Sequence, residues 1–334
     1  MKLKLALTGF VLALAATAHG AEYKLLNVSY DPTRELYAEY NKAFTAYYEK
    51  KTGDQVTISQ SHGGSGAQAR SVIDGSPADV VSLALSPDID IIADSTDLLD
   101  KDWESKYPND ASPYTSTIVF LVRKGNPKGI HDWNDLVDKE GVEIITPNPK
   151  TSGAARYSFL AAYAYADQLY GGDESKIKEY LVRLFARVPV LDTGARGSTN
   201  TFVQRKIGDV LLAWENEAYL SLARLGKDNF ELVTPSLSIL AKPPVAIVTK
   251  NARAHGTEHI ADEYIKYLYS EEAQEIIARN FYRPSNPQVL ARHKEQFSDI
   301  NLVDVSKYGG FRAFSTRFFD DGGWFDQIQQ EINR

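Results

Sequence analysis

Short apolar runs alternate along this chain with longer segments in which apolar residues recur every three or four positions. The short runs predict strands and the longer segments predict helices. The predicted strands cover residues 23–28, 55–60, 78–85, 117–123, 142–145, 188–191, 209–213 and 245–248. Helical patterns lie between most of these strands and dominate after the last one. This order predicts an α/β fold with mostly parallel sheets and right-handed crossovers.

The junctions that follow five of the predicted strands carry small residues, helix-capping residues or a hydrogen-bond donor. They lie near Asp31, Ser65, Ser152, Ala195 and Trp214. Ligands bind at the carboxyl ends of parallel strands, and the free N–H groups at a helix N-terminus favour anions. The five junctions together predict a site that encloses a small anion with backbone N–H groups, one hydroxyl and one indole N–H.

The clearest of these junctions spans residues 146–157, which follow the apolar run at 142–145. Its two prolines end the strand, Thr151 or Ser152 is the expected N-cap, and Gly153 and Ala154 open a helix. Taken alone, this stretch fits an ordinary capped helix better than a binding site. Near the N-terminus, Asp31 is expected to cap a similar helix that runs to about Lys51.

The N-terminus has the pattern of a leader. Lys2 and Lys4 precede an apolar run over 5–16, and residues 16–20 offer small residues at which a leader can be cleaved. Residues 1–20 are therefore predicted to be a secretory signal peptide, and no later segment reaches transmembrane length. A chain of 334 residues without cysteine must rely on its core. The predicted location of the mature protein is the periplasm of a Gram-negative bacterium.

The charge balance argues against nucleic acid as a partner. Lysine and arginine number 37 against 44 aspartates and glutamates, which gives a net charge of −7, and no basic stripe or tail is present. Such a chain can still bind an anion where local dipoles dominate. Arg34, Arg156 and Arg196 lie beside three of the junctions, and we expect them to hold neighbouring acids, such as Asp31 or Glu217, more readily than the anion itself.

Three motifs suggest other chemistry, each weakly. Residues 64–69 match a relaxed dinucleotide fingerprint, but they do not lie in the first strand–helix unit. Residues 255–259 match an inverted zinc motif without a third ligand. An exported hydrolase using Ser65 or Ser152 would need a base, for which His62 is the only candidate nearby in sequence. We expect no cofactor, no metal and no catalysis.

The junction segments, taken together, resemble one family. Residues 27–35, 61–66, 147–150, 194–197 and 213–217 closely resemble the periplasmic sulfate-binding proteins, the receptors of the sulfate/thiosulfate ABC importer. The resemblance covers essentially the whole mature chain. It implies a two-lobed periplasmic-binding-protein fold (type II), with the ligand cleft between lobes that are joined by crossing strands near 117–123 and 245–248. One lobe would comprise 22–115 plus 246–334, and the other 116–245.

The resemblance also implies the site and its use. The expected donors are the backbone N–H groups of five residues, the hydroxyl of Ser152 and the indole of Trp214; the five are Asp31, Ser65, Gly153, Ala154 and Ala195. The family usually has Gly-Gly where this chain has Gly153-Ala154. The implied protein is a monomeric receptor that binds sulfate, and with it thiosulfate, and delivers it to the membrane permease subunits of an ABC importer. A receptor for another tetrahedral oxyanion, such as molybdate or phosphate, stays open.

Overall fold

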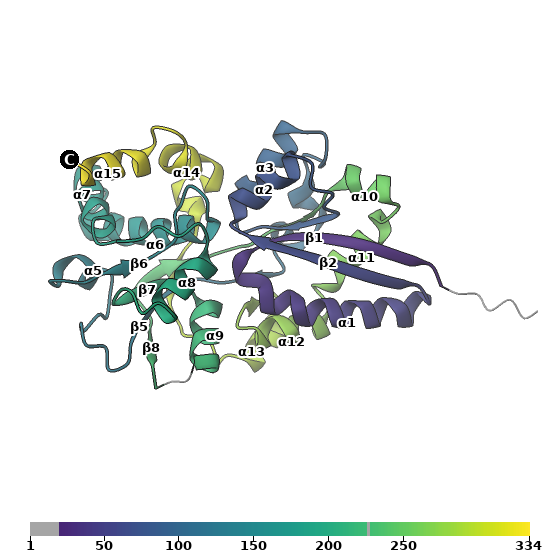
Figure 1. Cartoon of the computed structure of the whole chain (residues 1–334), viewed down its shortest axis with the longest axis horizontal. Coiled ribbons are helices and arrows are strands. Elements are labelled where there is room, and N and C mark those ends of the chain that lie inside the picture. Colours follow the sequence, from purple (N-terminus) through teal and green to yellow (C-terminus); the bar gives the residue numbers. More distant parts are fainter. Residues whose placement is uncertain (1–19, 226–227) are drawn as a thin grey trace, which may run out of the picture.

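The computed structural model describes residues 20–225 and 228–334, which form two lobes lying side by side (Figure 1). Each lobe is built on a four-stranded sheet with helices on its faces. The predicted signal peptide lies outside the described residues, apart from Gly20. No helix within the described ranges is long and apolar enough to cross a bilayer.

The first lobe contains the sheet with strand order β10-β3-β1-β2. Its strands are β1 (Glu22–Tyr30), β2 (Gln55–Gly63), β3 (Val80–Ser82) and β10 (Val245–Ile247). β1 pairs in parallel with both β2 and β3, whereas β10 is antiparallel to β3. The longer helices of this lobe are α1 (Arg34–Thr52), α2 (Ser65–Ile73), α3 (Ser86–Ser95), α10 (Thr249–His255), α11 (Glu258–Tyr267) and α12 (Glu271–Arg279). Its shorter helices are η1 (Asp31–Thr33), η2 (Trp103–Lys106), α4 (Pro108–Ala111) and α13 (Pro287–Arg292).

The core of the first lobe is rich in aromatic rings where α1 packs against α11. Tyr40 and Phe44 of α1 each contact Tyr264 of α11 edge to face, with ring centroids 5.1 Å apart in both pairs. These rings are buried, and the helical spacing of apolar residues in α1 places them on one face. This packing fixes the start of α1, and with it the turn at Asp31.

The second lobe contains the sheet with strand order β6-β7-β5-β8. Its strands are β5 (Ile118–Arg123), β6 (Ile144–Ile145), β7 (Val210–Trp214) and β8 (Phe230–Val233). Only the β6–β7 pair is parallel, because β5 runs antiparallel to both β7 and β8. The helices are α5 (Asp135–Asp138), α6 (Gly153–Tyr170), α7 (Glu174–Phe185), α8 (Ala195–Val203) and α9 (Glu215–Leu225).

Short paired segments join the two lobes. β4 (Tyr114–Thr115) pairs with β11 (Arg283–Pro284), and the next residue, Ser116, forms a two-way backbone bridge with Ala241. The crossing positions therefore lie just beside the two predicted crossing strands. Residues 118–123 and 245–247 are themselves strands of the second-lobe and first-lobe sheets.

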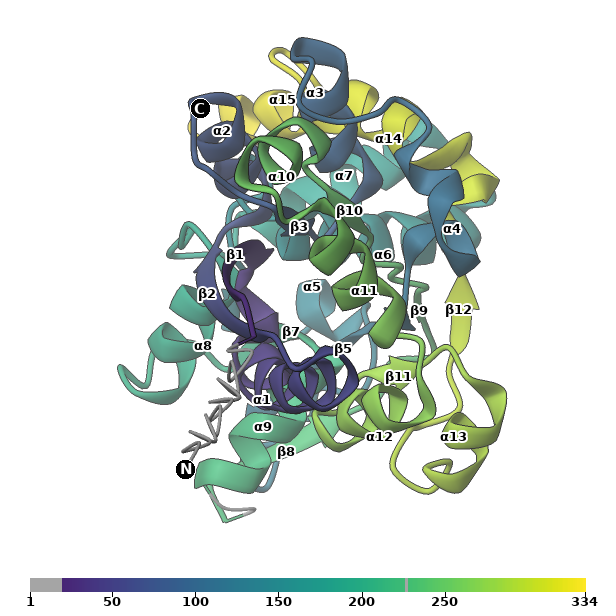
Figure 2. The same cartoon turned by 90° about the vertical axis from the view of Figure 1, so that its right-hand side faces the viewer.

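The C-terminal segment packs on the second lobe, although the sequence analysis grouped residues 246–334 with the first. β12 (Asn301–Val303) pairs in parallel with β9 (Leu237–Ile239), and the two lie side by side in Figure 2. After η3 (Val305–Tyr308), helices α14 (Gly310–Phe319) and α15 (Trp324–Ile332) cover α6 and α7. Phe159 of α6 contacts the rings of Phe318 and Phe325. Burial of these aromatic rings explains why the segment returns to the second lobe.

Three local expectations were wrong. The apolar run at 188–191 forms no strand, and only residues 80–82 of the run at 78–85 do. Asp31 makes no side-chain cap. Its carboxylate instead accepts a hydrogen bond from Arg34 at 2.8 Å, and the helix starts through a 3-10 turn. By contrast, α6 begins at the predicted Gly153, and β7 lies within one residue of the predicted strand at 209–213.

Candidate anion-binding site

The N-terminus of α6 has the predicted capped form. The hydroxyl oxygen of Ser152 accepts a hydrogen bond from the N–H of Ala155 at 3.4 Å, and the helix begins at Gly153. The preceding turn is held by Asn148, whose carbonyl accepts from the N–H groups of Thr151 and Ser152. The start of α6 is buried. The cap thus leaves the first two N–H groups of a long helix pointing at a site that is shielded from water.

The predicted backbone donors have no partners inside the protein. Among residues 20–225 and 228–334, no hydrogen bond is donated by the backbone N–H at any of the five predicted positions, which are Asp31, Ser65, Gly153, Ala154 and Ala195. All five residues are buried. A buried N–H without an acceptor costs about 1–3 kcal/mol, so several in one place indicate that something else accepts from them.

Trp214 adds a side-chain donor. It is the last residue of β7, it is 2% exposed, and its ring lies between Tyr30 at 5.4 Å and Tyr157 at 5.3 Å. Its indole nitrogen is buried and bonded to no group within the described part of the chain. An indole can only donate, so this group too requires an acceptor from outside the protein.

Several distances show that these donor groups lie close to one another at the boundary between the two lobes. Ala154, Ala195 and Trp214 line one enclosed cavity of about 10 Å³, measured as space for the centre of a water-sized sphere. A Cβ atom placed on Gly153 would lie 3.0 Å from the Cβ atom of Ser65 in the first lobe. The helix starts at α2, α6 and α8 and the end of β7 therefore meet at one place between the lobes.

Asp31 reaches the same place from the first lobe. A Cβ atom placed on Gly194, the residue before α8, would lie 2.2 Å from a carboxylate oxygen of Asp31 and 3.8 Å from the backbone nitrogen of Gly64. The structure thus gathers all seven sequence-predicted residues at the lobe boundary. The small cavity beside Ala154, Ala195 and Trp214 has room for about one water at most.

The serine hydroxyl that a hydrolase would use is already engaged. Ser65 donates to Asp88 at 2.5 Å and accepts from the N–H of Ala84 at 2.9 Å. The expected base, His62, lies with its Nδ1 atom 2.7 Å from Ser29 instead. Burial lowers the pKa of His62 to about 4, and the Arg34 charge acts in the same direction. Nothing in this arrangement activates Ser65 as a nucleophile.

The three arginines beside the junctions pair with acids, as the sequence analysis favoured. Arg34 contacts Asp31 at 2.8 Å and Arg156 contacts Asp88 at 3.1 Å. Arg196 of α8 lies 2.8 Å from Glu217 in its own lobe. Positive charge near the site is therefore largely balanced, and the uncompensated groups are N–H dipoles.

One acid, Glu35, ties the lobes together and was missed by sequence reasoning. From α1 of the first lobe it accepts from both Arg196 and Arg224 of the second lobe, each at 2.8 Å. Burial alone would raise the pKa of Glu35, but the Arg196 contacts lower it overall. Asn216 forms a second tie by donating to the carbonyl of Pro32 at 2.9 Å. The partners are far apart in sequence, so no local signal could have found them.

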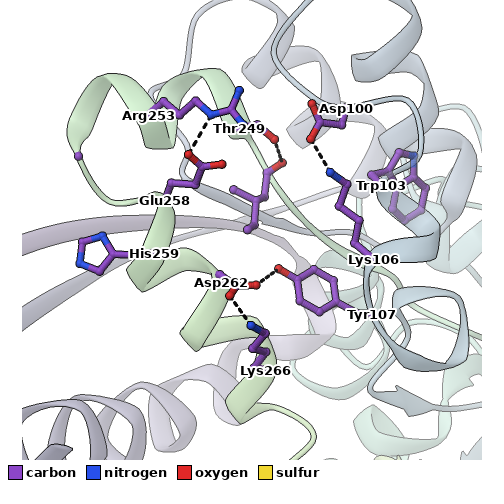
Figure 3. Close-up of a pocket in the computed structure, with 12 residues that line it drawn as sticks. Asp100, Trp103, Lys106, Tyr107, Thr249, Arg253, Glu258, His259, Asp262 and Lys266 are labelled. Carbon is purple, nitrogen blue, oxygen red and sulfur yellow. Dashed lines mark hydrogen bonds and ion pairs between the residues drawn. The ribbon is translucent and has the colours of Figure 1, made fainter. Parts of the chain in front are cut away.

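Two much larger cavities lie elsewhere, in the first lobe. One of about 830 Å³ lies between α10, α11 and η2 (Figure 3). Its acids and bases pair with one another, at 2.6–2.9 Å: Asp100 with Lys106, Glu258 with Arg253, and Asp262 with Lys266. Its size therefore does not identify a binding site, because its charged groups already have partners.

The predicted zinc motif borders this cavity, and its members point to separate partners. His255 lies 2.8 Å from Asp79, whereas Glu258 pairs with Arg253 and His259 packs edge to face on Tyr23. Among the described residues, no group of three or more His, Cys, Asp or Glu side chains is placed to hold a metal ion.

Comparison with known proteins decides the family. A family model described as "Bacterial extracellular solute-binding protein" matches residues 27–283. This chain belongs to that family. The sulfate-binding protein of Escherichia coli is 55% identical over 324 residues, covering 96% of this chain and 98% of that protein. The thiosulfate-binding protein of Pseudomonas aeruginosa is 50% identical over 318 residues, covering 95% of each chain. The resemblance to the sulfate-binding proteins is thereby confirmed.

Solved structures agree with this membership. The sulfate-binding protein SubI from Mycobacterium tuberculosis superposes with a TM-score of 0.81 at 31% identity, covering 89% of this chain and 100% of that one. A periplasmic thiamin-binding protein, at 16% identity and a TM-score of 0.67, shares the fold alone. The predicted α/β, two-lobed, type II fold is confirmed. The curated relatives are binding proteins, and this solute-binding chain is not an enzyme.

Proposed function

We propose that this protein is a periplasmic receptor that binds sulfate, and with it thiosulfate, between its lobes and delivers the anion to the permease subunits of an ABC importer. The observation that carries the proposal is the set of six buried donors without acceptors, five backbone N–H groups and the Trp214 indole, contributed by both lobes. The names of the close sulfate- and thiosulfate-binding relatives support the same ligand class.

Each donor has a defined part in this proposal. The backbone N–H groups of Asp31 and Ser65 come from the first lobe, and those of Gly153, Ala154 and Ala195 come from the second. The hydroxyl of Ser152 and the indole of Trp214 complete the shell. Ala154 keeps its role despite its methyl group, because its backbone does not take a positive φ and so does not require glycine.

The donor-only character of these groups supplies a reason for selectivity. A buried dianion is costly unless every oxygen finds donors, and helix N-termini stabilise negative charge without a contacting cation. Sulfate is fully deprotonated near neutral pH, whereas phosphate retains a proton that needs an acceptor. Unpaired or opposed donors cost about 1–3 kcal/mol each, which favours sulfate. Contacts from both lobes further imply that binding stabilises the closed arrangement, which then docks on the importer.

Calorimetric titration of the purified mature protein tests the proposal. Residues 1–20 are omitted as the proposed leader, and bound anion is removed by unfolding and dialysis. We expect one-to-one binding of sulfate, measurable binding of thiosulfate and no heat from phosphate near neutral pH. Absence of sulfate binding by the refolded protein would refute the proposal, and tight phosphate binding would refute the donor-only explanation. Binding of molybdate alone would reassign the receptor to another oxyanion.

A further inference from the structure

Gly64, in the first lobe, lies close to the backbone of the second lobe. It precedes α2, and a Cβ atom placed on it would lie 2.6 Å from the carbonyl oxygen of Thr151 and 3.0 Å from that of Thr193. Both carbonyls belong to the second lobe, one ahead of α6 and the other ahead of α8. Real Cβ atoms do not approach a backbone oxygen at 2.6 Å, so the closed arrangement leaves no room for a side chain here.

The backbone at Gly64 does not itself require glycine. Its φ of −59° and ψ of 133° are accessible to every residue type. Nearby Gly66 provides a contrast, because a Cβ atom there would meet nothing closer than 3.7 Å, which is ordinary contact. The need for glycine at position 64 therefore comes from the opposite lobe and not from its own turn.

Gly194 makes a second close approach, from the second lobe toward the first. A Cβ atom on Gly194 would lie 2.2 Å from a carboxylate oxygen of Asp31, while its φ of −153° is ordinary extended backbone. Here the obstacle is the end of a side chain, which can rotate away if its contact with Arg34 is given up. A side chain at position 194 would therefore hinder the approach of the lobes less than one at position 64, where the obstacle is main-chain atoms.

We infer that Gly64 and Gly194 are positioning residues for the anion: their missing side chains set how closely the lobes can approach. Hydrogen bonds of useful strength span a narrow range of about 2.7–3.2 Å between nitrogen and oxygen. Holding the lobes a few tenths of an ångström apart therefore weakens all donors from one lobe at once. Neither glycine needs to touch the ligand. The inference rests on the proposed function for the identity of that ligand.

Helix capping is the competing explanation, because Gly64 and Gly194 are both N-cap residues. Serine separates the two explanations: it caps a helix at least as well as glycine, whereas alanine caps poorly, and both add a Cβ atom. If clearance decides, Gly64→Ser and Gly64→Ala both lose affinity. If capping decides, Gly64→Ser retains it. Gly66→Ala is the matched control in the same segment.

The test is sulfate titration of the parent and the four variants (Gly64→Ser, Gly64→Ala, Gly66→Ala and Gly194→Ala) by calorimetry, with melting of the ligand-free forms as a check on folding. We expect at least about 30-fold weaker binding for both Gly64 variants, since a penalised closed state lowers apparent affinity in proportion to its population. Gly194→Ala should lose less, and Gly66→Ala should stay within about twofold of the parent. Affinity retained by Gly64→Ser, with or without a loss in Gly64→Ala, would overturn the inference.

A second readout does not depend on sulfate. The chain contains no cysteine, so Lys101→Cys and Glu140→Cys, at exposed positions of the first and second lobes, can carry a fluorescent dye pair. We expect Gly64→Ser to reduce the closed fraction of the labelled protein, with and without sulfate. Equal closed fractions in parent and variant would overturn the inference. Failure of the parent to bind sulfate would instead refute the proposed function, and the dye distances would still test the role of Gly64.

Discussion

Two cavities of this protein differ greatly in size, and the smaller one is better suited to an anion. The first-lobe cavity in Figure 3 is about 830 Å³ and is lined by lysine, arginine and acidic side chains. The cavity at the lobe boundary is about 10 Å³ and has no unpaired arginine beside it. The small one is nevertheless lined by Ala154, Ala195 and Trp214, whose N–H groups donate to no group within the described residues. Unsatisfied hydrogen-bonding capacity, rather than volume or charge count, is the basis on which we propose the binding site.

The physical reason lies in what each hollow offers to an incoming dianion. In the large cavity, Lys106 and Lys266 are well exposed and already paired, and exposed ion pairs contribute at most about 1 kcal/mol. At the lobe boundary the donors are fixed on helix starts and a strand end, and they are shielded from water. Hydrogen bonds to a charged partner are stronger in such surroundings, and within each lobe the helix starts and the strand end hold the donors in fixed positions.

Replacing one donor should give the largest effect. Trp214→Phe keeps the aromatic packing with Tyr30 and Tyr157 but removes the indole N–H. We expect sulfate affinity to fall by about 10- to 150-fold, because a hydrogen bond to a charged group contributes roughly 1.5–3 kcal/mol. Calorimetry measures the change. Trp103→Phe, in the large cavity, removes an indole that donates to Asp90 and should leave affinity unaltered. Equal losses in the two variants would contradict the comparison.

The next effect concerns Ser152, which caps α6 and is proposed to donate its hydroxyl to the anion. Ser152→Ala should weaken sulfate binding by about tenfold and lower the free energy of unfolding by about 1 kcal/mol. Ser270→Ala is the matched control, since Ser270 caps α12 through the N–H of Ala273 at 3.1 Å in the first lobe. In urea titration, Ser270→Ala should show a decrease in the free energy of unfolding similar to that of Ser152→Ala, and its affinity for sulfate should be unchanged. If Ser152→Ala bound sulfate with normal affinity, the hydroxyl of Ser152 would not be one of the donors.

A smaller effect should follow from loosening the tie between the lobes. Glu35→Gln weakens the contacts with Arg196 and Arg224 and should lower affinity by about fivefold, mainly through faster dissociation. Stopped-flow mixing that follows tryptophan fluorescence measures both rates. Asp100→Asn, which removes a charge paired with Lys106 inside the first lobe, is the control and should change neither rate. Slower association with unchanged dissociation would argue against a closed-state role for Glu35.

The smallest expected effect is on pH dependence. Burial lowers the pKa of His62 to about 4, with Arg34 adding to the shift and Asp31 and Glu35 opposing it. The unfolded chain then binds more protons than the folded one between pH 6.5 and 4, so this contribution to stability is present above pH 6.5 and is lost as the pH falls. His62→Gln should reduce the drop in Tm between pH 7 and pH 5 by roughly 2–4 °C.

The control for this prediction is His259→Gln, which replaces an exposed ring on the far side of the first lobe. Thermal melts of the three proteins at both pH values suffice. If His62→Gln and the parent lose the same number of degrees, the burial of His62 does not govern the acid sensitivity of the lobe.

Features with a local cause could be predicted from the sequence. The start of α6 follows from two prolines, a capping serine and a glycine, and Trp214 was placed correctly because a buried strand leads directly to it. The run at 188–191 failed because its backbone builds no ladder with β6. The N–H of Val188 turns back to the carbonyl of Phe185, and the N–H of Ile144 bonds to the carbonyl of Arg187, just before the run. Apolar composition alone does not reveal whether a partner strand is available.

Features with a distant cause could not be predicted. The contacts of Glu35 with Arg196, and of Gly64 with Thr151 and Thr193, join residues far apart in the chain and depend on how two lobes meet. The placement of the C-terminal helices on the second lobe is of the same kind. Their amphipathic pattern indicates that one face is buried but does not say against which lobe.

The return of the C-terminal helices to the second lobe bears on the order of events during protein synthesis. The second-lobe core lacks Phe318 and Phe325 until the ribosome has made almost the entire chain. The first lobe lacks β10 and α11 until after all four strands of the second-lobe sheet have been made. Neither core can be completed early, so the growing chain has no finished domain to fold. We expect it to stay open to chaperones and to acquire its structure late, in one concerted step.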